Sequence, residues 1–220
     1  MGKAVGGFPL KRCPMSDRTY PVYEFNRIDT GPVTLTGTAA RLEPLGVEHL
    51  DALCAVGLTG DIFRWYPTPV RSRDEMAAWI GFALAEQQAG RMLPFVTVDQ
   101  ATGRIAGSTR YLAIDKANRH VEIGYTWLGK GFQRSGLNRD AKLLMLRHAF
   151  EVWGCVRVEF KTDSNNVQSR TALAGIGAVE EGTFRNHVVR ADGSLRHSVY
   201  FSVTDREWPD VKERLTPRGP

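Results

Sequence analysis

The sequence contains few cysteines and no apolar segment long enough to cross a membrane. Cys13, Cys54 and Cys155 are widely separated, odd in number and without the spacing of metal ligands, which argues against a disulfide framework and favours a reducing compartment. No uninterrupted apolar run approaches the roughly 18 to 20 residues that a bilayer-spanning helix needs, and the N-terminus lacks a compact apolar signal core. We therefore expect a cytoplasmic protein, and we predict no metal site.

Dense runs of lysine or arginine are also missing, although the chain is basic overall. Its formal net charge is +5 and its isoelectric point is near 9.3. Such a balance is compatible with a nucleic-acid partner, with a ligand that carries several phosphates, or with an ordinary basic surface. Because no dense basic run is present, a nucleic-acid partner is the least favoured of the three.

The length and organisation of the chain indicate one domain. A chain of 220 residues is long enough for one substantial core and short for two, and it has no internal repeat, linker or low-complexity tract. Residues 1–30 mix Gly, Pro, Lys and Arg without a clear period, so we expect a poorly ordered extension there, with Met15 as an alternative to Met1 as the natural start. A single domain is expected over residues 31–216.

The stretch from Val121 to Phe150 is the most informative part of the chain. It opens with VEIGYTWL, whose β-branched and aromatic residues predict a strand, and the glycines that follow end that strand. From Leu137 the apolar residues recur at helical intervals, which predicts a long amphipathic helix. The residues expected on the polar side of this helix are Arg139, Asp140, Lys142 and Arg147.

A strand that passes through a glycine-containing turn into a helix leaves several free backbone N–H groups at one place, which favours a phosphate. Two familiar phosphate-binding patterns do not fit. The run from Gly124 to Lys130 imitates the opening of a nucleotide-binding P-loop, but Gly131 follows where a metal-binding hydroxyl is required. The pair Gly129 and Gly131 lacks the third glycine of the dinucleotide fingerprint. An alternative is that these glycines only make a tight turn.

The turn fits a third pattern better. Gln133-Arg134-Ser135-Gly136-Leu137-Asn138 resembles the Q/R-x-x-G-x-G/A signature of the GNAT superfamily of N-acetyltransferases. Further motifs are similar to the Rim-type branch, which is named for enzymes that acetylate the amino termini of ribosomal proteins: Glu122-Ile-Gly-Tyr125, Asn166-x-x-Ser169, Gly175-Ile-Gly177-Ala178 and Glu181-Gly182. The resemblance covers roughly residues 35–215. One departure is Asn138, which stands where the signature usually has Gly or Ala.

Patterns elsewhere predict elements that would complete such a fold. We expect a strand pair over 33–36 and 40–45, helices over 47–56 and 72–89, strands over 93–98, 104–114, 119–128 and 156–161, a helix over 166–175 capped by Asp163 or Asn165, a hairpin over 179–190 and 195–203, and a tail helix that docks through Trp208, Val211 and Leu215. The aromatic loop over 61–70 either lines a substrate cleft or covers the edge of the core.

The strand over 156–161 directly follows the long helix, so we expect it to lie parallel to the strand at Val121 through a right-handed crossover. Where two neighbouring parallel strands diverge, a cleft opens that can hold a ligand. The resemblance implies an α/β (α+β) GNAT fold: a central mixed, mostly antiparallel sheet flanked by helices, with a splayed parallel strand pair that forms the acetyl-CoA cleft.

The resemblance also implies roles for individual residues. Acetyl-CoA would be the acetyl donor, its pantetheine arm would pair with the backbone of Trp127 and Leu128, and Asn166 would contact the same arm. Backbone N–H groups of Gln133, Arg134, Ser135, Gly136, Leu137 and Asn138 would hold the pyrophosphate. Ser169 is the candidate acid for the departing thiolate, with a surface or helix-cap role as the alternative for it and for Asn166.

Transfer of an acetyl group to an amine needs a base, because only the neutral amine attacks. Glu122 is the candidate base, since a partly buried carboxylate beside the cleft would have a raised pKa. The alternative is that Glu122 pairs with Arg110 or Arg119 and only fixes strand register.

We therefore predict an acetyl-CoA-dependent N-acetyltransferase, a monomer or homodimer, that acts on a protein N-terminal amine. Two alternatives remain open. The acceptor can instead be a small amine such as an antibiotic, a polyamine or an aminoacyl nucleotide, or the protein can be a non-catalytic acyl-CoA-binding or RNA-associated module. A membrane partner is not expected.

Overall fold

The computed structural model describes residues 27–217, and the expectations about Met1, Met15 and most of the N-terminal extension lie outside these residues. The end of the expected extension is described, and its Ile28 is buried in the core at 2% exposure. The described part of the chain therefore includes residues 27–30 of the expected extension.

Eight strands form one mixed sheet in the order β1-β2-β3-β4-β5-β6-β8-β7. Every neighbouring pair is antiparallel except β5 and β6, which are parallel. The strands are β1 (Leu35–Thr36), β2 (Ala40–Pro44), β3 (Leu93–Asp99), β4 (Ile105–Asp115), β5 (His120–Leu128), β6 (Arg157–Asp163), β7 (Val179–Val189) and β8 (Leu195–Thr204). The predicted fold class and the predicted parallel pair are both confirmed.

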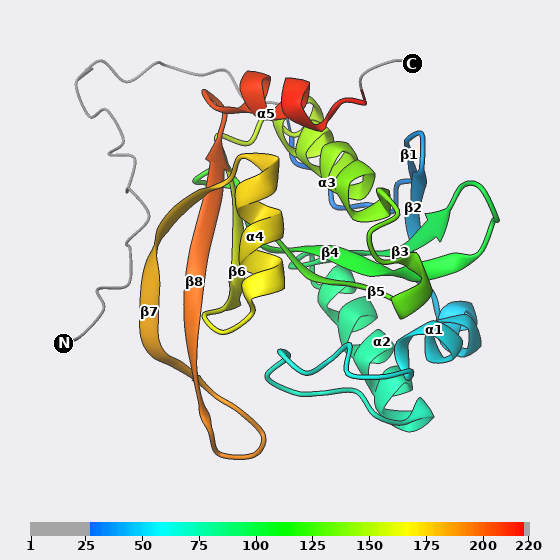
Figure 1. The fold of residues 1–220 in the computed structure, drawn as a ribbon. Helices are drawn as coiled ribbons and strands as arrows, with labels where there is room; N and C mark the ends of the chain where they lie inside the picture. The colour runs from blue at the N-terminus through cyan, green and yellow to red at the C-terminus, as the bar shows by residue number, and fades with distance from the viewer. Residues whose placement is uncertain (1–26, 218–220) are drawn as a thin grey trace.

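Helices cover both faces of the sheet (Figure 1). They are the 3-10 turn η1 (Val47–His49), α1 (Leu50–Gly57), α2 (Arg73–Gln88), the 3-10 turn η2 (Lys130–Phe132), α3 (Leu137–Arg147), the π-helical turn η3 (His148–Val152), α4 (Val167–Ile176) and α5 (Trp208–Leu215). In Figure 1, α3 lies on one side of β4 and β5, and α1 and α2 lie on the other side. No helix of the described chain is both long enough and apolar enough to cross a membrane.

Two hydrophobic cores fill the spaces between the sheet and these helices. The larger core joins the sheet to α3, α4 and α5 and contains Val121, Ile123 and Phe160. The second joins the other face to α1 and α2 and contains Trp79 and Trp127. Because successive side chains of a strand point to opposite faces, β5 contributes to both cores.

Helix caps agree with the sequence patterns at α2 and differ at α4. The Ser72 hydroxyl accepts the Glu75 N–H at 3.2 Å, as the capping-box pattern predicts. At α4 the prediction of Asp163 or Asn165 as cap is wrong, because the Asn166 side chain accepts the Ser169 N–H at 3.0 Å. The Asp163 carboxylate instead pairs with the arginines of β7–β8, Arg190 and Arg196.

The C-terminal helix docks as predicted. Trp208, Val211 and Leu215 of α5 are all buried in the larger core, at 6%, 3% and 1% exposure. The Trp208 ring stacks on Phe150 with their centroids 5.4 Å apart. Helix α5 thereby holds α3 and η3 against the sheet.

Close approach of β4 and β5 requires glycine at position 107. A Cβ on Gly107 would lie 2.0 Å from the carbonyl oxygen of Trp127, and backbone atoms cannot move away without disturbing the pairing of the two strands. We predict that Gly107→Ala lowers the free energy of unfolding by about 1 to 3 kcal/mol. Urea denaturation monitored by circular dichroism measures this effect.

Gly175→Ala is the matched control. Gly175 lies inside α4, and no heavy atom lies within 4 Å of the position of its Cβ. Alanine there should raise the free energy of unfolding by about 0.5 to 1 kcal/mol, because glycine loses more backbone entropy in a helix. A Gly107→Ala variant as stable as the wild type would contradict the close approach.

Candidate functional site

The parallel pair at the centre of the sheet is hydrogen-bonded over a short distance only. β5 and β6 pair at three positions, His120 with Arg157, Val121 with Val158 and Glu122 with Glu159. Beyond these positions β6 continues to pair with β8 as far as Asp163, and β5 continues to pair with β4 as far as Leu128. The two strands therefore diverge, and the facing backbone edges between them have no strand partner within residues 27–217.

A β-bulge lies in the diverging part of β5. The segment from Gly124 to Trp127 faces only Arg110 to Ser108 on β4, so β5 carries one additional residue. Tyr125 absorbs it with a φ of +49°, a left-handed conformation that is costly for an aromatic residue. Such strain typically persists where a backbone must be re-aimed at a functional site.

The bulge also changes which side chains share a face. Strict alternation would place Glu122 and Trp127 on opposite faces of β5. With the extra residue, Tyr125 and Trp127 both contact the core beside α1 and α2, whereas Thr126 turns toward α3, where its hydroxyl accepts a hydrogen bond from Lys142.

The turn between β5 and α3 ends on a helix without a capping side chain. Gly136 occupies the N-cap position with a φ of +86°, and no side chain caps the helix. No heavy atom lies within 4 Å of where its Cβ would be. Among residues 27–217, the backbone N–H groups from Arg134 to Arg139 have no hydrogen-bond acceptor. These oriented donors and the positive end of the helix dipole suit an anion such as a pyrophosphate.

Side chains of the turn brace its shape. The Gln133 side-chain amide donates to the Leu128 carbonyl oxygen at 3.0 Å, and the Ser135 hydroxyl donates to the Phe132 carbonyl oxygen at 2.6 Å. The Gln133 N–H is directed to the Lys130 carbonyl oxygen at 3.4 Å. Gln133 therefore contributes less to the open donor set than the five residues after it.

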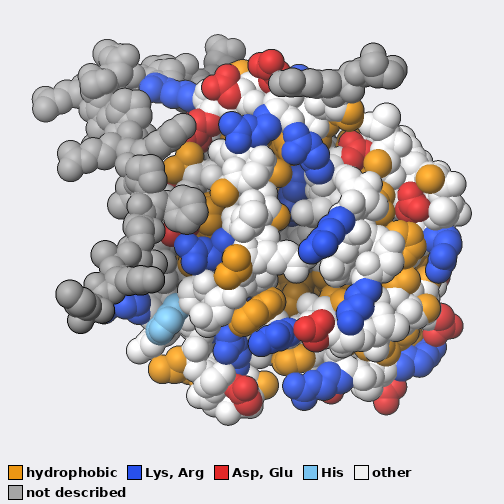
Figure 2. Space-filling view, in the orientation of Figure 1, with side chains coloured by type: hydrophobic (Ala, Val, Ile, Leu, Met, Phe, Trp, Pro, Cys, Tyr) orange, Lys and Arg blue, Asp and Glu red, His pale blue; other side chains and the backbone are white. Residues whose placement is uncertain are grey.

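The surface is hollowed beside these elements. Figure 2 shows a depression between the part of the molecule that carries α4 and the part that carries α3 and β5, with several Lys and Arg side chains around it, mostly on the side of α3 and β5. Positive potential along such a depression attracts ligands that carry several negative charges.

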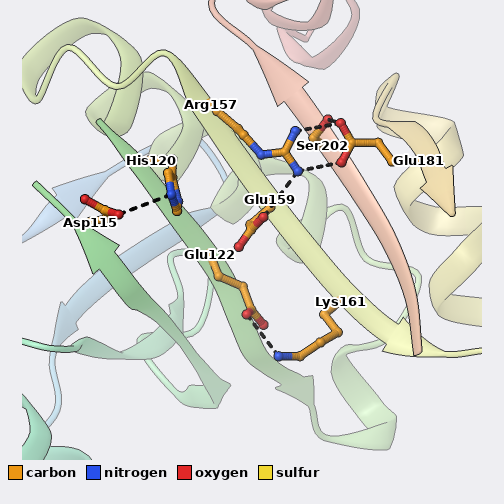
Figure 3. A network of polar contacts seen from close by, with 8 residues as sticks. All are labelled: Asp115, His120, Glu122, Arg157, Glu159, Lys161, Glu181 and Ser202. Atoms are coloured by element: carbon orange, nitrogen blue, oxygen red, sulfur yellow. Dashed lines mark hydrogen bonds and ion pairs between the residues drawn. The ribbon is translucent and has the colours of Figure 1, made fainter. Parts of the chain in front are cut away.

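Glu122 lies next to the last residue pair before the strands diverge. It is 5% exposed, and its carboxylate accepts a hydrogen bond from Lys161 Nζ of β6 at 3.2 Å (Figure 3). Burial raises the pKa of Glu122 above its ordinary value, and Lys161 offsets only part of this effect. The direction agrees with the expected raised pKa.

The two arginines considered as alternative partners of Glu122 lie elsewhere. Arg110 is fully buried with its guanidinium carbon 3.7 Å from the ring centre of Trp79 and 4.5 Å from that of Tyr125. Arg119 donates to the carbonyl oxygens of Trp153 and Gly154. The prediction that either of them pairs with Glu122 is wrong, and Lys161 takes that place.

Other charged groups beside Glu122 pair among themselves. Figure 3 shows Arg157 pointing toward Glu181 and Glu159, and His120 pointing toward Asp115. The β5 and β6 residues of these ion pairs lie where the two strands are still hydrogen-bonded to each other. Among the residues in this view, only Lys161 bonds to the Glu122 carboxylate.

Asn166 and Ser169 lie at the start of α4. The Asn166 side-chain oxygen is used by the helix cap, and its side-chain nitrogen has no partner in the described chain. Ser169 is partly buried, and its hydroxyl likewise has no partner within residues 27–217. The cap role considered for Asn166 is therefore present, and its N–H₂ group stays available to a ligand.

The aromatic loop covers a core, and buried polar atoms without a partner in the described chain lie in the same region. Phe63 is 4% exposed and packs edge-on against Tyr66 and Trp127. The buried polar atoms without a partner in residues 27–217 include the Tyr66 hydroxyl and the indole nitrogens of Trp79 and Trp127. Buried donors of this kind are usually satisfied by water or a ligand.

Two lysines at the site were missed by the sequence patterns. Alternation of side chains along β6 places Glu159 and Lys161 on the same face of the sheet as Glu122. A prediction of the register between β5 and β6 would therefore have identified Lys161 as a partner of Glu122. Lys142 was expected on the polar side of α3, and this prediction is wrong, because Lys142 is 5% exposed. Its side chain enters the interior to bond Thr126, a contact that helical periodicity does not reveal.

Asp140 was also expected on the polar side of α3 and is 7% exposed. Its carboxylate accepts the N–H groups of Ala39 and Ala40 at 2.7 and 2.8 Å. This contact fastens the start of α3 to the β1–β2 turn.

No group of three or more side chains in residues 27–217 is arranged to hold a metal ion.

Three features define the class of fold: one splayed pair of parallel strands, a bulge in one of these strands, and an uncapped helix that follows it. Together they suit the binding of a phosphate-bearing ligand. The acetyltransferase (GNAT) domain model matches residues 40–179 of this chain. The chain therefore belongs to the GNAT family of acetyltransferases.

Individual relatives agree with this assignment. A GCN5-related N-acetyltransferase from Brucella melitensis is 32% identical, with a TM-score of 0.78 over 88% of this chain and 89% of that chain. YdaF of Bacillus subtilis, named as a candidate ribosomal N-acetyltransferase, is 33% identical over 110 residues, which are 50% of this chain and 59% of that relative.

RimJ of Mycobacterium smegmatis, solved in complex with CoA-disulfide, is 26% identical, with a TM-score of 0.70 over 84% of this chain and 91% of that chain. The likeness to YdaF and RimJ supports the Rim-type branch.

The bond between Asp140 and the β1–β2 turn gives a stability prediction. Asp140→Ala leaves two amides without their acceptor and should lower the free energy of unfolding by about 2 to 4 kcal/mol. Urea denaturation measures this change. Asp61→Ala is the control, because the exposed Asp61 side chain makes no hydrogen bond in residues 27–217. Equal stability of the two variants would contradict the anchoring role.

Proposed function

We propose that the protein transfers the acetyl group of acetyl-CoA to a primary amine. The observation that carries this proposal is the alignment of two features along β5: the strand diverges from β6 after Glu122, and it leads into a helix whose first N–H groups have no acceptor in the described chain. A long ligand with a pyrophosphate at one end and a reactive thioester at the other fits such a site. The GNAT family membership of the chain supports the same chemistry.

The residues proposed to hold the donor follow from this geometry. The backbone N–H groups of Arg134, Ser135, Gly136, Leu137 and Asn138 would bind the pyrophosphate, with Gln133 shaping the turn. The backbone of Trp127 and Leu128 would pair with the pantetheine arm, and the Asn166 side-chain N–H₂ group would donate to it. Acetyl-CoA supplies an activated acyl group when bound. The CoA-disulfide in the RimJ structure supports a coenzyme A site in a relative.

Glu122 is the proposed base. Its carboxylate is buried beside the point of divergence, and its pKa is raised, so it accepts a proton more readily than an exposed glutamate. It would take a proton from the amine as the new carbon–nitrogen bond forms. Ser169 is the proposed acid for the departing thiolate. Unpaired N–H groups along the diverging edge of β5 would stabilise the negative oxygen that develops.

The proposed acceptor is a protein N-terminal amine, acted on in the cytoplasm by a single domain of residues 31–216 in a monomer or homodimer. The support for this acceptor is the likeness to YdaF and RimJ, the first of which carries ribosomal N-acetylation in its name. Acetyl-CoA-dependent release of thiol in the presence of peptides with a free N-terminus tests it. Turnover of small amines but not of peptides would show that the acceptor is a small amine. Coenzyme A binding without turnover of any amine would indicate a binding module.

The conformation of Gly136 gives a prediction about the donor. Gly136→Val forces a β-branched residue to a positive φ, which costs roughly 1 to 2 kcal/mol and turns the N–H groups away from the pyrophosphate. We expect the Kd for coenzyme A to rise about tenfold or more, as measured by isothermal titration calorimetry. Gly131→Ala is the matched control, because Gly131 has open space and no positive φ. Equal affinity of both variants would argue against the pyrophosphate site.

The raised pKa of Glu122 gives a prediction about pH. Glu122 is active as a base only when ionised, so kcat should rise as the pH increases through a pKa above the ordinary glutamate value. Glu122→Gln should remove this rise and lower kcat by about 10² to 10⁴-fold, with little change in coenzyme A affinity.

Measurement of kcat against pH with saturating substrates distinguishes these outcomes. Glu180→Gln is the control, since Glu180 is exposed and pairs with Arg170. A Glu122→Gln variant with wild-type kcat at every pH would eliminate Glu122 as the base.

A further inference from the structure

The two oxygens of the Glu122 carboxylate have different surroundings. Oε2 accepts a hydrogen bond from Lys161 Nζ at 3.2 Å, whereas no donor of residues 27–217 bonds Oε1. A Cβ on Gly124 would lie 3.0 Å from Oε1. This oxygen is therefore directed along β5 toward a residue that comes after the last hydrogen-bonded pair of β5 and β6. The free oxygen faces the diverging part of the strands.

Lys161 is held in place by the sheet rather than by a loop. Its backbone pairs with Tyr200 of β8, and its ammonium lies 5.7 Å from the centre of the Tyr200 ring. It comes two residues after Glu159, the residue of β6 that pairs with Glu122, and so lies on the same face of the sheet. The side chain crosses from β6 to β5 where the two strands separate (Figure 3).

The other ionisable groups around Glu122 make no hydrogen bond to its carboxylate. Next to burial, Lys161 has the largest influence on the pKa of Glu122, and it acts in the opposite direction. Weaker influences come from Glu159, which raises this pKa, and from Arg196, which lowers it. The ionisable groups on the surrounding elements are Glu159 of β6, Arg196 and Tyr200 of β8, Arg110 and Asp115 of β4, His120 and Tyr125 of β5, and Tyr66 of the aromatic loop.

We propose that Lys161 is a positioning residue for the base: its ammonium holds Oε2 of Glu122 and keeps the carboxylate ionised, so that Oε1 is presented to the acceptor amine. This inference rests on the function proposed above. Lys161 neither gives nor takes a proton in the reaction, and it acts only through Glu122.

The physical reason is the cost of a buried negative charge. Burial favours the protonated form of Glu122, which cannot act as a base, and a nearby ammonium favours the ionised form. Removal of the ammonium should therefore raise the pKa of Glu122 further. The pH at which kcat begins to rise should then increase as well, because the base must be ionised to accept the proton.

Three variants separate the charge of Lys161 from its hydrogen bond. Lys161→Met removes both, Lys161→Gln keeps a donor without the charge, and Lys161→Arg keeps both. The Lys161 side chain is 28% exposed, so these replacements fit at the surface of the site. Lys212→Met is the matched control, because Lys212 of α5 also pairs with a glutamate, Glu151, at 2.8 Å.

The first measurement follows the side-chain carboxyl carbon of Glu122 against pH by ¹³C nuclear magnetic resonance in the protein without ligand. The resonance is identified by its absence in Glu122→Gln. We expect the pKa of Glu122 to rise by about one unit or more in Lys161→Met and Lys161→Gln, and to stay at the wild-type value in Lys161→Arg and Lys212→Met. The same pKa in the wild type, Lys161→Met and Lys161→Gln would overturn the inference.

The second measurement is kcat against pH with saturating acetyl-CoA and an active amine. The rise of kcat should move to higher pH by the same amount in Lys161→Met and Lys161→Gln, which lowers kcat about tenfold or more on the acidic side. At alkaline pH, kcat of Lys161→Gln should return to within threefold of the wild type, because the amide still holds Oε2. A lysine with only a structural role would lower kcat by one factor at every pH, and that result would overturn the inference.

The two measurements keep this inference apart from the proposed function. A raised pKa of Glu122 in Lys161→Met and Lys161→Gln, with the rise of kcat unmoved, would overturn the role of Lys161 and leave the acetyltransferase intact. Absence of acetyl transfer from the wild type to any amine would overturn the proposed function, and with it the role of Lys161 in catalysis. Circular dichroism checks the fold of each variant. Should Lys161→Met not fold, Lys161→Gln against Lys161→Arg decides in the same way.

Discussion

The short parallel pairing between β5 and β6 is the constraint on which the site depends. Hydrogen bonds join the strands only as far as Glu122 and Glu159, and each strand then follows its antiparallel neighbour. Those neighbours, β4 and β8, lead them apart. Because α3 connects the two strands, its first turn lies at the open end of the gap. One topological feature thereby places unpaired backbone edges, a helix N-terminus and the buried Glu122 carboxylate around the same space.

Burial acts in opposite directions on the pKa values of two ionisable side chains next to β5. It raises the pKa of Glu122 and lowers that of Lys142, since both charged forms lose solvation. A carboxylate and an ammonium on opposite sides of one strand are thus both brought toward their uncharged forms without direct contact. The bulge at Tyr125 supports this division, because it turns Thr126 toward Lys142 while Trp127 stays on the face of α1 and α2.

The order and type of the elements could be predicted from the sequence, because alternation, helical periodicity and turn glycines report local structure. The parallel pair followed from the crossover through the helix that begins at Leu137. The side-chain contacts could not be predicted in the same way. The partner of Glu122 depends on strand register, the cap of α4 depends on the exact turn after β6, and the burial of Asp140 and Lys142 depends on single polar contacts that override helical amphipathicity.

The central claim is that the open N–H groups of the turn and the diverging edge of β5 hold one extended ligand. Amide chemical shifts of the ¹⁵N-labelled protein during titration with coenzyme A test it most directly. The account predicts the largest shifts at the amides of Arg134 to Arg139 and a second set along β5 beyond Glu122. Saturation by coenzyme A with shifts confined to other surfaces, and none at these two segments, would contradict it.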